Sequence, residues 1–363
     1  MNGRLRSHRA RDACAAAPFP DDALPGSRMP PADPPSRAGR PSSPRRCVTE
    51  LSPQTAVEQV FLATHKQLRP NRNGQLYLQV ELADRSGAIT GRMWNASDAE
   101  FEAFDDGDYV RVEGMTQLFS GNLQIIIQGI GRVDPRGIDE REFQVLSAAD
   151  VARLRGELAE LLGTIPPGPL RELCDETLAD GELMTAFCRS PAGVKHHHAH
   201  AGGLLEHVVN LLRLAHCVAP LYPAIDRDLL LVGVLFHDIG KTIELESERG
   251  FSYTDAGQLL GHVLLGLEIV EKKREQVEAR IGRPIEDELV VRIKHMVASH
   301  HGQYEFGAPK LPMTLEALAL HHLDHMDAKL AGILQLMQNE AAIDGGWTQY
   351  QQSLGRKFFK GRG

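Results

Sequence analysis

Cysteine is scarce in this sequence, and its spacing excludes several kinds of site. The 363 residues include five cysteines, an odd number, and no pair has CxxC spacing: Cys14, Cys47, Cys174, Cys188 and Cys217. This pattern argues against a zinc ribbon and favours a reducing compartment. We therefore expect a cytoplasmic protein.

Long apolar runs are missing as well. No stretch approaches 18 uninterrupted apolar residues, and no apolar segment follows the arginines near the N-terminus. We expect neither a membrane span nor a secretory signal. The length and the ordinary hydrophobic content suit two or three globular domains.

Positive charge is also in deficit. The formal net charge is −8, and residues 1–47 contain nine arginines and four acidic residues, a net +5, so the remainder carries −13. A body this negative does not favour nucleic-acid binding over its whole surface. Any grip on RNA or DNA must therefore be local.

Residues 1–47 differ in composition from the rest of the chain. They contain nine of the 21 prolines and little aliphatic periodicity, so we expect a disordered Pro/Arg-rich extension. A basic arm for RNA is the functional alternative. A further hypothesis places the natural translation start at Val48, where the ordered pattern begins.

Residues 48–135 show the short, alternating strands of a small barrel. The pattern predicts a helix at 97–104, capped by Ser97 and Glu100, and strands at 76–82, 89–94, 109–114 and 123–127. Several strands of this length with one interposed helix favour a five-stranded all-β barrel of the OB type.

OB barrels bind single strands by stacking bases on exposed aromatic rings within a basic groove. The aromatic candidates are Tyr77, Trp94, Tyr109 and Phe119. The cationic candidates for phosphate contacts are Lys66, Arg69, Arg72, Arg92 and Arg111. The structural alternative for each ring is a place in the barrel core.

Helical periodicity dominates after a linker at 134–137. Segments 151–162 and 170–188 are expected to be helical, within an all-α domain over residues 145–345. The tail, residues 346–363, mixes basic and aromatic side chains. We expect a frayed terminus there, with RNA contact as the alternative.

One apolar run ends in polar residues that carry chemistry. Residues 229–236 are apolar apart from Gly233, and His237, Asp238, Gly240 and Lys241 follow. The run predicts a buried helix ending near Gly240. Burying an imidazole beside a carboxylate costs several kcal/mol unless a partner such as a divalent cation compensates. The structural alternative is a capping Asp beside a core His.

Fourteen of the sixteen histidines lie at or after His196. Several of these, and two late aspartates, lie on or at the ends of apolar helical segments: His207, His237, His262, His300, His301, Asp324 and Asp327. A helical bundle can point all of them inward. Five such placements in one domain favour a metal site over isolated core histidines.

Residues 50–335 carry a family resemblance. The motifs lie at 88–114, 197–215, 229–245 and 320–330, including HDIGK and LHHLDHMDAKL. The helical part resembles the HD-domain metal-dependent phosphohydrolases. An OB-like barrel ahead of an HD domain resembles the YhaM-type 3′→5′ exoribonucleases.

The resemblance implies a two-metal site in which Asp238 bridges both ions and Lys241 lies near the scissile phosphate. It implies His207, His237 and Asp324 as ligands of one ion and His262, His300 and His301 as ligands of the other. Asp327 is then expected behind the ligands or as the alternative ligand. Histidine with carboxylate ligands suits Mn²⁺, Co²⁺, Fe²⁺ and Zn²⁺ and disfavours Mg²⁺. The resemblance tips the expectation toward two Mn²⁺ ions.

Substrate contacts are expected around this centre. His198 and His200 precede the first metal helix, and the Gly- and Pro-containing loop 302–310 offers Tyr304, Phe306 and Lys310. The alternatives are polar residues at a helix start and a lid without substrate contacts.

The sequence therefore predicts a 3′→5′ exoribonuclease that hydrolyses single-stranded RNA through a two-metal-activated hydroxide. Single-stranded DNA is a further candidate substrate, and a homo-oligomer is compatible with the sequence. The polarity follows from the family resemblance alone. The alternatives are a nucleotide or cyclic-dinucleotide phosphohydrolase and a binding protein with a vestigial site.

Overall fold

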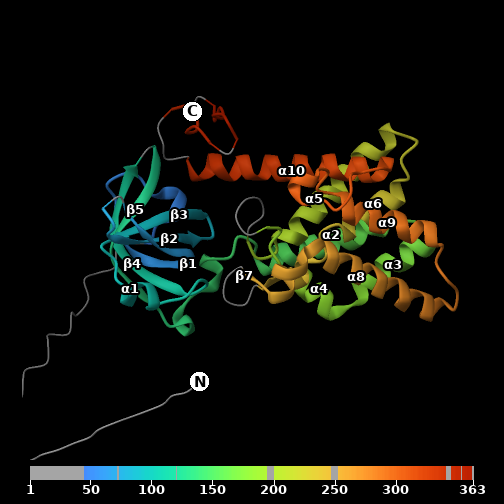
Figure 1. Cartoon of the computed structure of the whole chain (residues 1–363), viewed down its shortest axis with the longest axis horizontal. Coiled ribbons are helices and arrows are strands. Elements are labelled where there is room, and N and C mark those ends of the chain that lie inside the picture. Colours follow the sequence, from blue (N-terminus) through green and yellow to red (C-terminus); the bar gives the residue numbers. More distant parts are fainter. Residues whose placement is uncertain are drawn as a thin grey trace, which may run out of the picture. The chain divides into compact units, whose positions relative to one another are not determined.

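The computed structural model in Figure 1 describes residues 45–361, apart from 72, 120, 194–199, 247–251, 341–344 and 353. The predictions for residues 1–44, for Arg72 and for His198 lie outside the described residues.

The N-terminal part is a closed five-stranded barrel with strand order β1-β2-β3-β5-β4. β3 and β5 pair in parallel, and the other neighbours pair antiparallel. The strands are β1 (Ala56–Pro70), β2 (Leu76–Asp84), β3 (Gly87–Trp94), β4 (Tyr109–Phe119) and β5 (Asn122–Arg132). This confirms the predicted OB-type barrel.

The barrel core follows from the period of two in the strands. In β2, Leu78, Val80 and Leu82 are fully buried, while the residues between them are partly exposed. The expected helix is α1 (Asp98–Glu102), and the Ser97 backbone N–H donates to the Glu100 carboxylate as the capping box predicts.

The packed barrel begins earlier than the predicted boundary at Val48. Arg45 donates from Nη1 to the carbonyl of Val60, and its guanidinium lies 4.4 Å above the ring of Phe143. Val48 itself donates its backbone N–H to the buried carboxylate of Asp84, 2.8 Å away. Residues 45–47, assigned by the prediction to the disordered extension, therefore belong to the packed barrel.

The C-terminal part is helical, as predicted for an HD domain. Its α-helices are α2 (Ala148–Leu162), α3 (Pro169–Ala179), α4 (Gly181–Phe187), α5 (Gly203–Val218), α6 (Arg227–Phe236), α7 (Lys241–Glu244), α8 (Asp255–Ile281), α9 (Asp287–Ser299) and α10 (Leu315–Asn339). The short elements are β6 (Leu245–Glu246), β7 (Ser252–Tyr253) and the 3₁₀ turns η1 (Val48–Glu50), η2 (Pro135–Gly137), η3 (Glu140–Glu142), η4 (Ala219–Leu221) and η5 (Tyr304–Phe306).

α6 is the central helix of this domain. All its residues from Leu229 to Phe236 are buried, as expected for a helix that is apolar on every side. Asp226 caps its N-terminus by accepting the N–H of Leu229. The helix ends at Phe236, so His237 and Asp238 lie at its C-terminal edge and not inside a helix that runs to Gly240.

The predicted helical segment 170–188 is two helices. Asp180 ends α3 and caps α4, because its Oδ1 accepts the N–H of Leu183. Its Oδ2 lies 2.7 Å from the ammonium of Lys273, which is almost fully buried. A tertiary ion pair thus fixes a break that helical periodicity does not signal.

The expectation of a frayed tail is wrong for the described part of residues 345–361. Antiparallel bridges join Trp347 to Phe359 and Gln351 to Arg356. The backbone N–H of Thr348 donates to the carbonyl of Phe358 at 2.8 Å. This segment is a hairpin, drawn in red after α10 in Figure 1.

Among the described residues, one helical stretch, Gly203–Leu221, has the length and composition to cross a bilayer. Half of its apolar window is buried inside the protein, and the stretch contains the fully buried His207. We interpret it as a core helix.

Glu316 joins three helices and provides a test of the packing. Its carboxylate, 2% exposed, accepts the N–H of Asp226 at 2.9 Å and contacts Arg292 at 3.0 Å. We expect Glu316→Ala to lower the free energy of unfolding by about 2–4 kcal/mol, because both partners lose a buried acceptor. Thermal and urea unfolding measure this loss. The exposed Glu160→Ala is the control, and equal stability of the two variants would contradict the prediction.

Candidate metal centre

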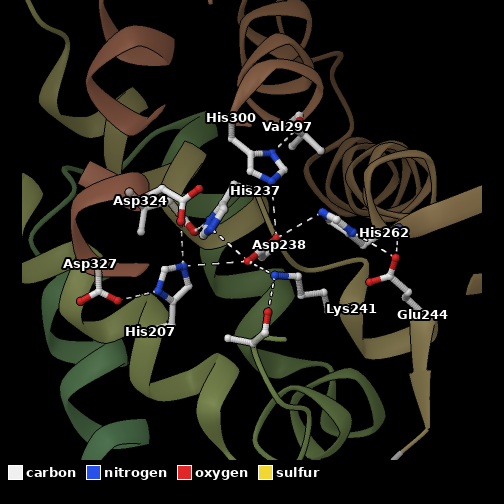
Figure 2. Close-up of polar contacts among 12 residues, drawn as sticks. His207, His237, Asp238, Lys241, Glu244, His262, Val297, His300, Asp324 and Asp327 are labelled. Atoms are coloured by element: carbon white, nitrogen blue, oxygen red, sulfur yellow. Dashed lines mark hydrogen bonds and ion pairs between the residues drawn. The ribbon is translucent and has the colours of Figure 1, made fainter. Parts of the chain in front are cut away.

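Five helices of the C-terminal domain bring their polar side chains to one buried point, shown in Figure 2. α5 contributes His207, the C-terminal end of α6 contributes His237 and Asp238, and α8 contributes His262. His300 and His301 follow the end of α9, and Asp324 and Asp327 lie on α10. The structure thus brings together all the residues that the sequence proposes as metal ligands.

The carboxylate of Asp238 lies at the middle of this cluster. Its Oδ1 is 3.5 Å from Nε2 of His262 and 3.5 Å from Nε2 of His300. Its Oδ2 is 3.3 Å from Nε2 of His237 and 3.9 Å from Nε2 of His207. The two oxygens therefore face two different sets of imidazoles.

These sets form two groups of potential ligand atoms. In the first, atoms of His207, His237 and Asp238 lie within 4.8 Å of one another. In the second, atoms of His262, His300 and His301 do so. The grouping has the form of the two-ion assignment that the family resemblance implies.

Helix ends orient two of the imidazoles. His237 is the C-cap of α6, and its Nδ1 lies 2.8 Å from the carbonyl oxygen of Val234. His300 is the C-cap of α9, and its Nδ1 lies 2.7 Å from the carbonyl of Val297. A carbonyl only accepts, so Nδ1 carries the proton and Nε2 presents a lone pair to the centre. Each histidine also satisfies a carbonyl of the last helical turn.

A break in α8 places the third imidazole. Gly261 has φ 73° and ψ 158°, a left-handed φ that favours glycine, and the break leaves the N–H of His262 outside the helical ladder. One oxygen of Glu244 accepts this N–H at 2.9 Å and the Nδ1–H of His262 at 3.1 Å. Glu244 thus caps the second half of α8 and turns Nε2 of His262 toward Asp238.

The two late aspartates contact opposite nitrogens of His207. Asp327 Oδ2 accepts from Nδ1 at 2.7 Å, while Asp324 Oδ1 lies 3.2 Å from Nε2, the nitrogen that faces the centre. This geometry supports Asp324 as the ligand and Asp327 as the residue that orients His207.

Gly240 allows the turn at residues 237–240, which contains His237 and Asp238, to approach α8 closely. A Cβ atom at this position would lie 1.9 Å from the carbonyl oxygen of His262 and 2.7 Å from the backbone nitrogen of Gly266. Both are backbone atoms that cannot rotate away. The glycine therefore keeps Asp238 and His262 within reach of each other.

Electrostatics keep three of the donors, Asp238, His300 and His301, in metal-binding form. Burial lowers the pKa of His300, and burial together with His300 and His262 lowers the pKa of His301 to about 4, so both are neutral near pH 7. Burial opposes ionisation of Asp238, but Lys241 and His237 outweigh it and hold the pKa of that carboxyl well below its usual range. Burial lowers the pKa of His207, but the hydrogen bonds of Asp324 and Asp327 outweigh burial and raise that pKa to about 9.

Lys241 contacts the central carboxylate directly. Its Nζ lies 2.6 Å from Asp238 Oδ2 and also donates to the carbonyl oxygen of Ala192. The ammonium is therefore fixed beside the oxygen that faces His207 and His237. It is the one lysine drawn at the centre in Figure 2.

The donor set fits divalent cations. Among the described residues, buried acceptor atoms without a hydrogen-bond partner gather here: Nε2 of His237, His262 and His300, Nδ1 of His301 and Oδ1 of Asp238. Lone pairs that face one another across 3.3–3.5 Å repel unless a cation lies between them. Imidazole and carboxylate donors suit Mn²⁺, Fe²⁺, Co²⁺ and Zn²⁺.

The expected substrate contacts lie farther out. Tyr304, Phe306 and Lys310 are exposed in the loop after His301. Gly307 brings this loop past the centre, because a Cβ there would lie 3.9 Å from Nδ1 of His301. His200 contacts Glu206 at 3.2 Å. Neither of the two ligand groups found among the described residues includes His200. Roles for these side chains stay predictions.

The barrel exposes several of its candidate residues. Trp94 is 46% and Phe119 54% exposed. Tyr77 and Trp94 are cross-strand partners with ring centroids 5.2 Å apart. The guanidinium of Arg92 lies 5.4 Å from the ring of Phe119. We call this group of rings the stacking surface, after the role expected of it, and Arg111 is exposed on β4.

Two other barrel candidates make contacts within the protein. Tyr109 packs against Phe143 with ring centroids 4.8 Å apart. Lys66 donates to the carbonyl of Phe101, lies 4.4 Å above its ring, and pairs with Asp105. These contacts satisfy the Lys66 ammonium within the barrel.

Sequence reasoning missed two residues that support the centre. Glu244 acts through a tertiary contact, and only the Gly261-His262 pair hinted at a break there. His321 donates from Nδ1 to the carbonyl of His300 at 2.8 Å, and its ring fills the space beside Gly302. No spacing rule pairs these residues, because the contacts join separate helices.

Glu244 provides a test of the centre that does not depend on activity. We expect Glu244→Ala to weaken divalent-metal binding by about 10- to 100-fold, because His262 loses the group that orients it. Glu244→Gln keeps an acceptor oxygen and should recover most of this loss. Calorimetric titration with Mn²⁺ measures the affinities, with the exposed Glu268→Gln on α8 as control. Unchanged affinity in Glu244→Ala would contradict the assigned role.

Two family matches cover the two parts of the chain. The HD domain family matches residues 204–329, and the OB-fold nucleic acid binding domain family matches residues 62–133. The first match contains the helices that carry the metal centre, and the second contains most of the barrel.

Curated relatives match across both parts and carry the name 3'-5' exoribonuclease YhaM. The chain is 34% identical to the protein from Listeria welshimeri over 71% of this chain and 80% of the relative. It is 33% identical to the protein from Geobacillus sp. over 79% and 86%, and 32% identical to that from Bacillus subtilis over 71% and 80%. At this identity and coverage, the chain belongs to the YhaM family of 3′-5′ exoribonucleases.

Proposed function

We propose that this protein is a metal-dependent 3′→5′ exoribonuclease that holds single-stranded RNA on its barrel and hydrolyses it at the HD centre. The observation that carries the proposal is the position of Asp238 between two groups of imidazoles, 3.3–3.9 Å from four of them. The family name of the relatives supplies the substrate and the polarity.

Two divalent cations are proposed for the two ligand groups. His207, His237 and Asp324 would hold one, His262, His300 and His301 the other, and Asp238 would serve both. When bound, such ions neutralise charge on a phosphodiester and lower the pKa of water toward neutrality. The nitrogen-rich donor set favours Mn²⁺ over Mg²⁺, and the family resemblance tips the choice toward Mn²⁺.

The chain's own residues supply the preorganisation. Backbone carbonyls, Glu244 and Asp327 each accept an Nδ1–H, so four imidazoles keep the tautomer that binds a cation. Lys241 places a fixed positive charge 2.6 Å from Asp238, where it can contact a phosphate oxygen. Burial of the centre strengthens both interactions, because little water competes.

The barrel is proposed to hold the strand. Trp94 and Phe119 expose flat rings, and Arg92 lies beside one of them, which is the arrangement that stacks successive bases without reading their sequence. Stacking does not detect the 2′-hydroxyl, so single-stranded DNA stays a candidate substrate. Tyr77, Arg111, Tyr304, Lys310, His198 and His200 remain proposed contacts.

Asp238 gives the direct test of the hydrolytic centre. We expect Asp238→Ala to lose at least 10³-fold in turnover of end-labelled single-stranded RNA, on the order of the loss when a charge-stabilising group is removed. RNA affinity should change little, because the barrel is untouched. The wild-type protein with Mn²⁺ should give a ladder that shortens from the 3′ end, and EDTA should stop it. Wild-type turnover by Asp238→Ala would rule out this centre.

Trp94 tests the barrel separately. We expect Trp94→Ala to weaken binding of a 20-nucleotide RNA by about 1–3 kcal/mol, the range for loss of one base–aromatic stack. The rate of dinucleotide hydrolysis should fall much less, because a dinucleotide is too short to contact the barrel and the HD centre at the same time. The buried Phe61 is unsuitable as a control, so the exposed Val291→Ala on α9 is used. Equal losses on both substrates would assign the barrel a purely structural role.

A further inference from the structure

The C-terminal hairpin, residues 345–361 as far as the structure describes them, differs in composition from the acidic body of the protein. It contains Arg356, Lys357 and Lys360 and no acidic residue, in a protein whose formal net charge is −8. It is therefore a local positive segment on a negative protein, and such a segment attracts a polyanion.

The hairpin also exposes aromatic rings. Trp347 is 56%, Tyr350 59% and Phe359 52% exposed. Trp347 and Phe359 are cross-strand partners whose ring centroids lie 5.1 Å apart at an interplanar angle of 54°. Base stacking and phosphate contact require exposed rings and cations on one segment, and the hairpin has both.

The hairpin is built on a fixed support. Glu340, 4% exposed, accepts the N–H of Gln349 at 2.7 Å and the side-chain amide of Gln351 at 3.0 Å. The ammonium of Lys360 donates to the carbonyl oxygen of Glu340 at 2.8 Å. The rings therefore project from an ordered scaffold, which lowers the entropy lost when a ligand binds.

The hairpin adjoins the stacking surface of the barrel. A Cβ atom at Gly121 would lie 2.2 Å from the side chain of Gln349, so this residue packs against the turn between β4 and β5. Phe119, beside Arg92, ends β4 two residues before Gly121. The hairpin therefore contacts the barrel close to the end of the strand that carries Phe119.

We propose that the C-terminal hairpin is a second binding platform for single-stranded RNA, in which Trp347, Tyr350 and Phe359 stack bases while Arg356 and Lys357 contact phosphates. The proposal rests on the proposed function, because it extends the same RNA path. Only RNA that is long enough to extend past Trp94 and Phe119 on the barrel is expected to contact the hairpin.

The test uses full-length double variants and a 20-nucleotide unstructured RNA, with EDTA present to prevent hydrolysis. We expect Trp347→Ala with Phe359→Ala to weaken binding by on the order of 10-fold or more. Arg356→Gln with Lys357→Gln should reduce the slope of log affinity against log salt by about 1.4, or roughly 0.7 per charge. Both variants should lose more affinity for this 20-nucleotide RNA than for a dinucleotide.

Matched controls lie on the helical domain. Tyr222→Ala removes a ring as exposed as that of Tyr350, at 59%, and Arg283→Gln removes an exposed cation. Both should bind the RNA as the wild type does. Melting curves report whether the aromatic variant folds. If it does not, the charge variant decides, because both of its side chains are exposed and Arg356 donates from Nε to the carbonyl oxygen of Leu354 within the hairpin itself.

Binding within two-fold of wild type by both double variants would overturn the proposal. A change in sedimentation with RNA binding unchanged would assign the rings to contact between copies of this chain, and would also overturn it. Failure of the wild type itself to bind or cut RNA would sink the proposed function. If the wild type cuts RNA and the double variants bind RNA with wild-type affinity, only the proposal for the hairpin is contradicted.

Discussion

Repulsion among the buried acceptor atoms around Asp238 opposes the assembly of the helical domain. A carboxylate and imidazole lone pairs at 3.3–3.5 Å, shielded from water, disfavour one another by several kcal/mol unless positive charge lies between them. Lys241 supplies one positive charge, beside Oδ2. Oδ1, which faces His262 and His300, has none among the described residues. The fold must therefore hold this cluster together until cations stabilise it.

Hydrogen bonds at the helix ends hold the cluster together. His237 and His300 each cap a helix by donating to a carbonyl three residues earlier, so the hydrogen bonds that finish α6 and α9 also set the imidazole tautomers. The break at Gly261 in α8 exposes an N–H that Glu244 accepts along with the imidazole of His262. Secondary-structure termination and metal-ligand orientation are thus the same interactions, and neither can be changed alone.

What the sequence could predict follows from how local each signal is. Alternation in residues 76–82 and the apolar run before His237 predict a strand and a buried helix, because burial on one face or all faces is written in successive residues. The order of histidines and aspartates, with the family resemblance, predicted the ligand cluster. The break at Asp180, the role of Glu244 and the C-terminal hairpin depend on partners such as Lys273, His262 and Glu340. These partners lie far away in the sequence, or at a separation that no helix or strand period predicts. The periodicity of the sequence therefore does not reveal the contacts.

Under the proposed function, the charge distribution separates RNA binding from RNA hydrolysis. Four carboxylates surround the centre against the single ammonium of Lys241: Asp238, Glu244, Asp324 and Asp327. Without bound cations this region repels a phosphodiester, and the negative body adds to the repulsion. The barrel rings need no metal, because stacking does not depend on the charge at the centre. Under the proposed function, exposed rings would hold a strand at any metal concentration, and the strand end would enter the centre only when bound cations offset the local negative charge.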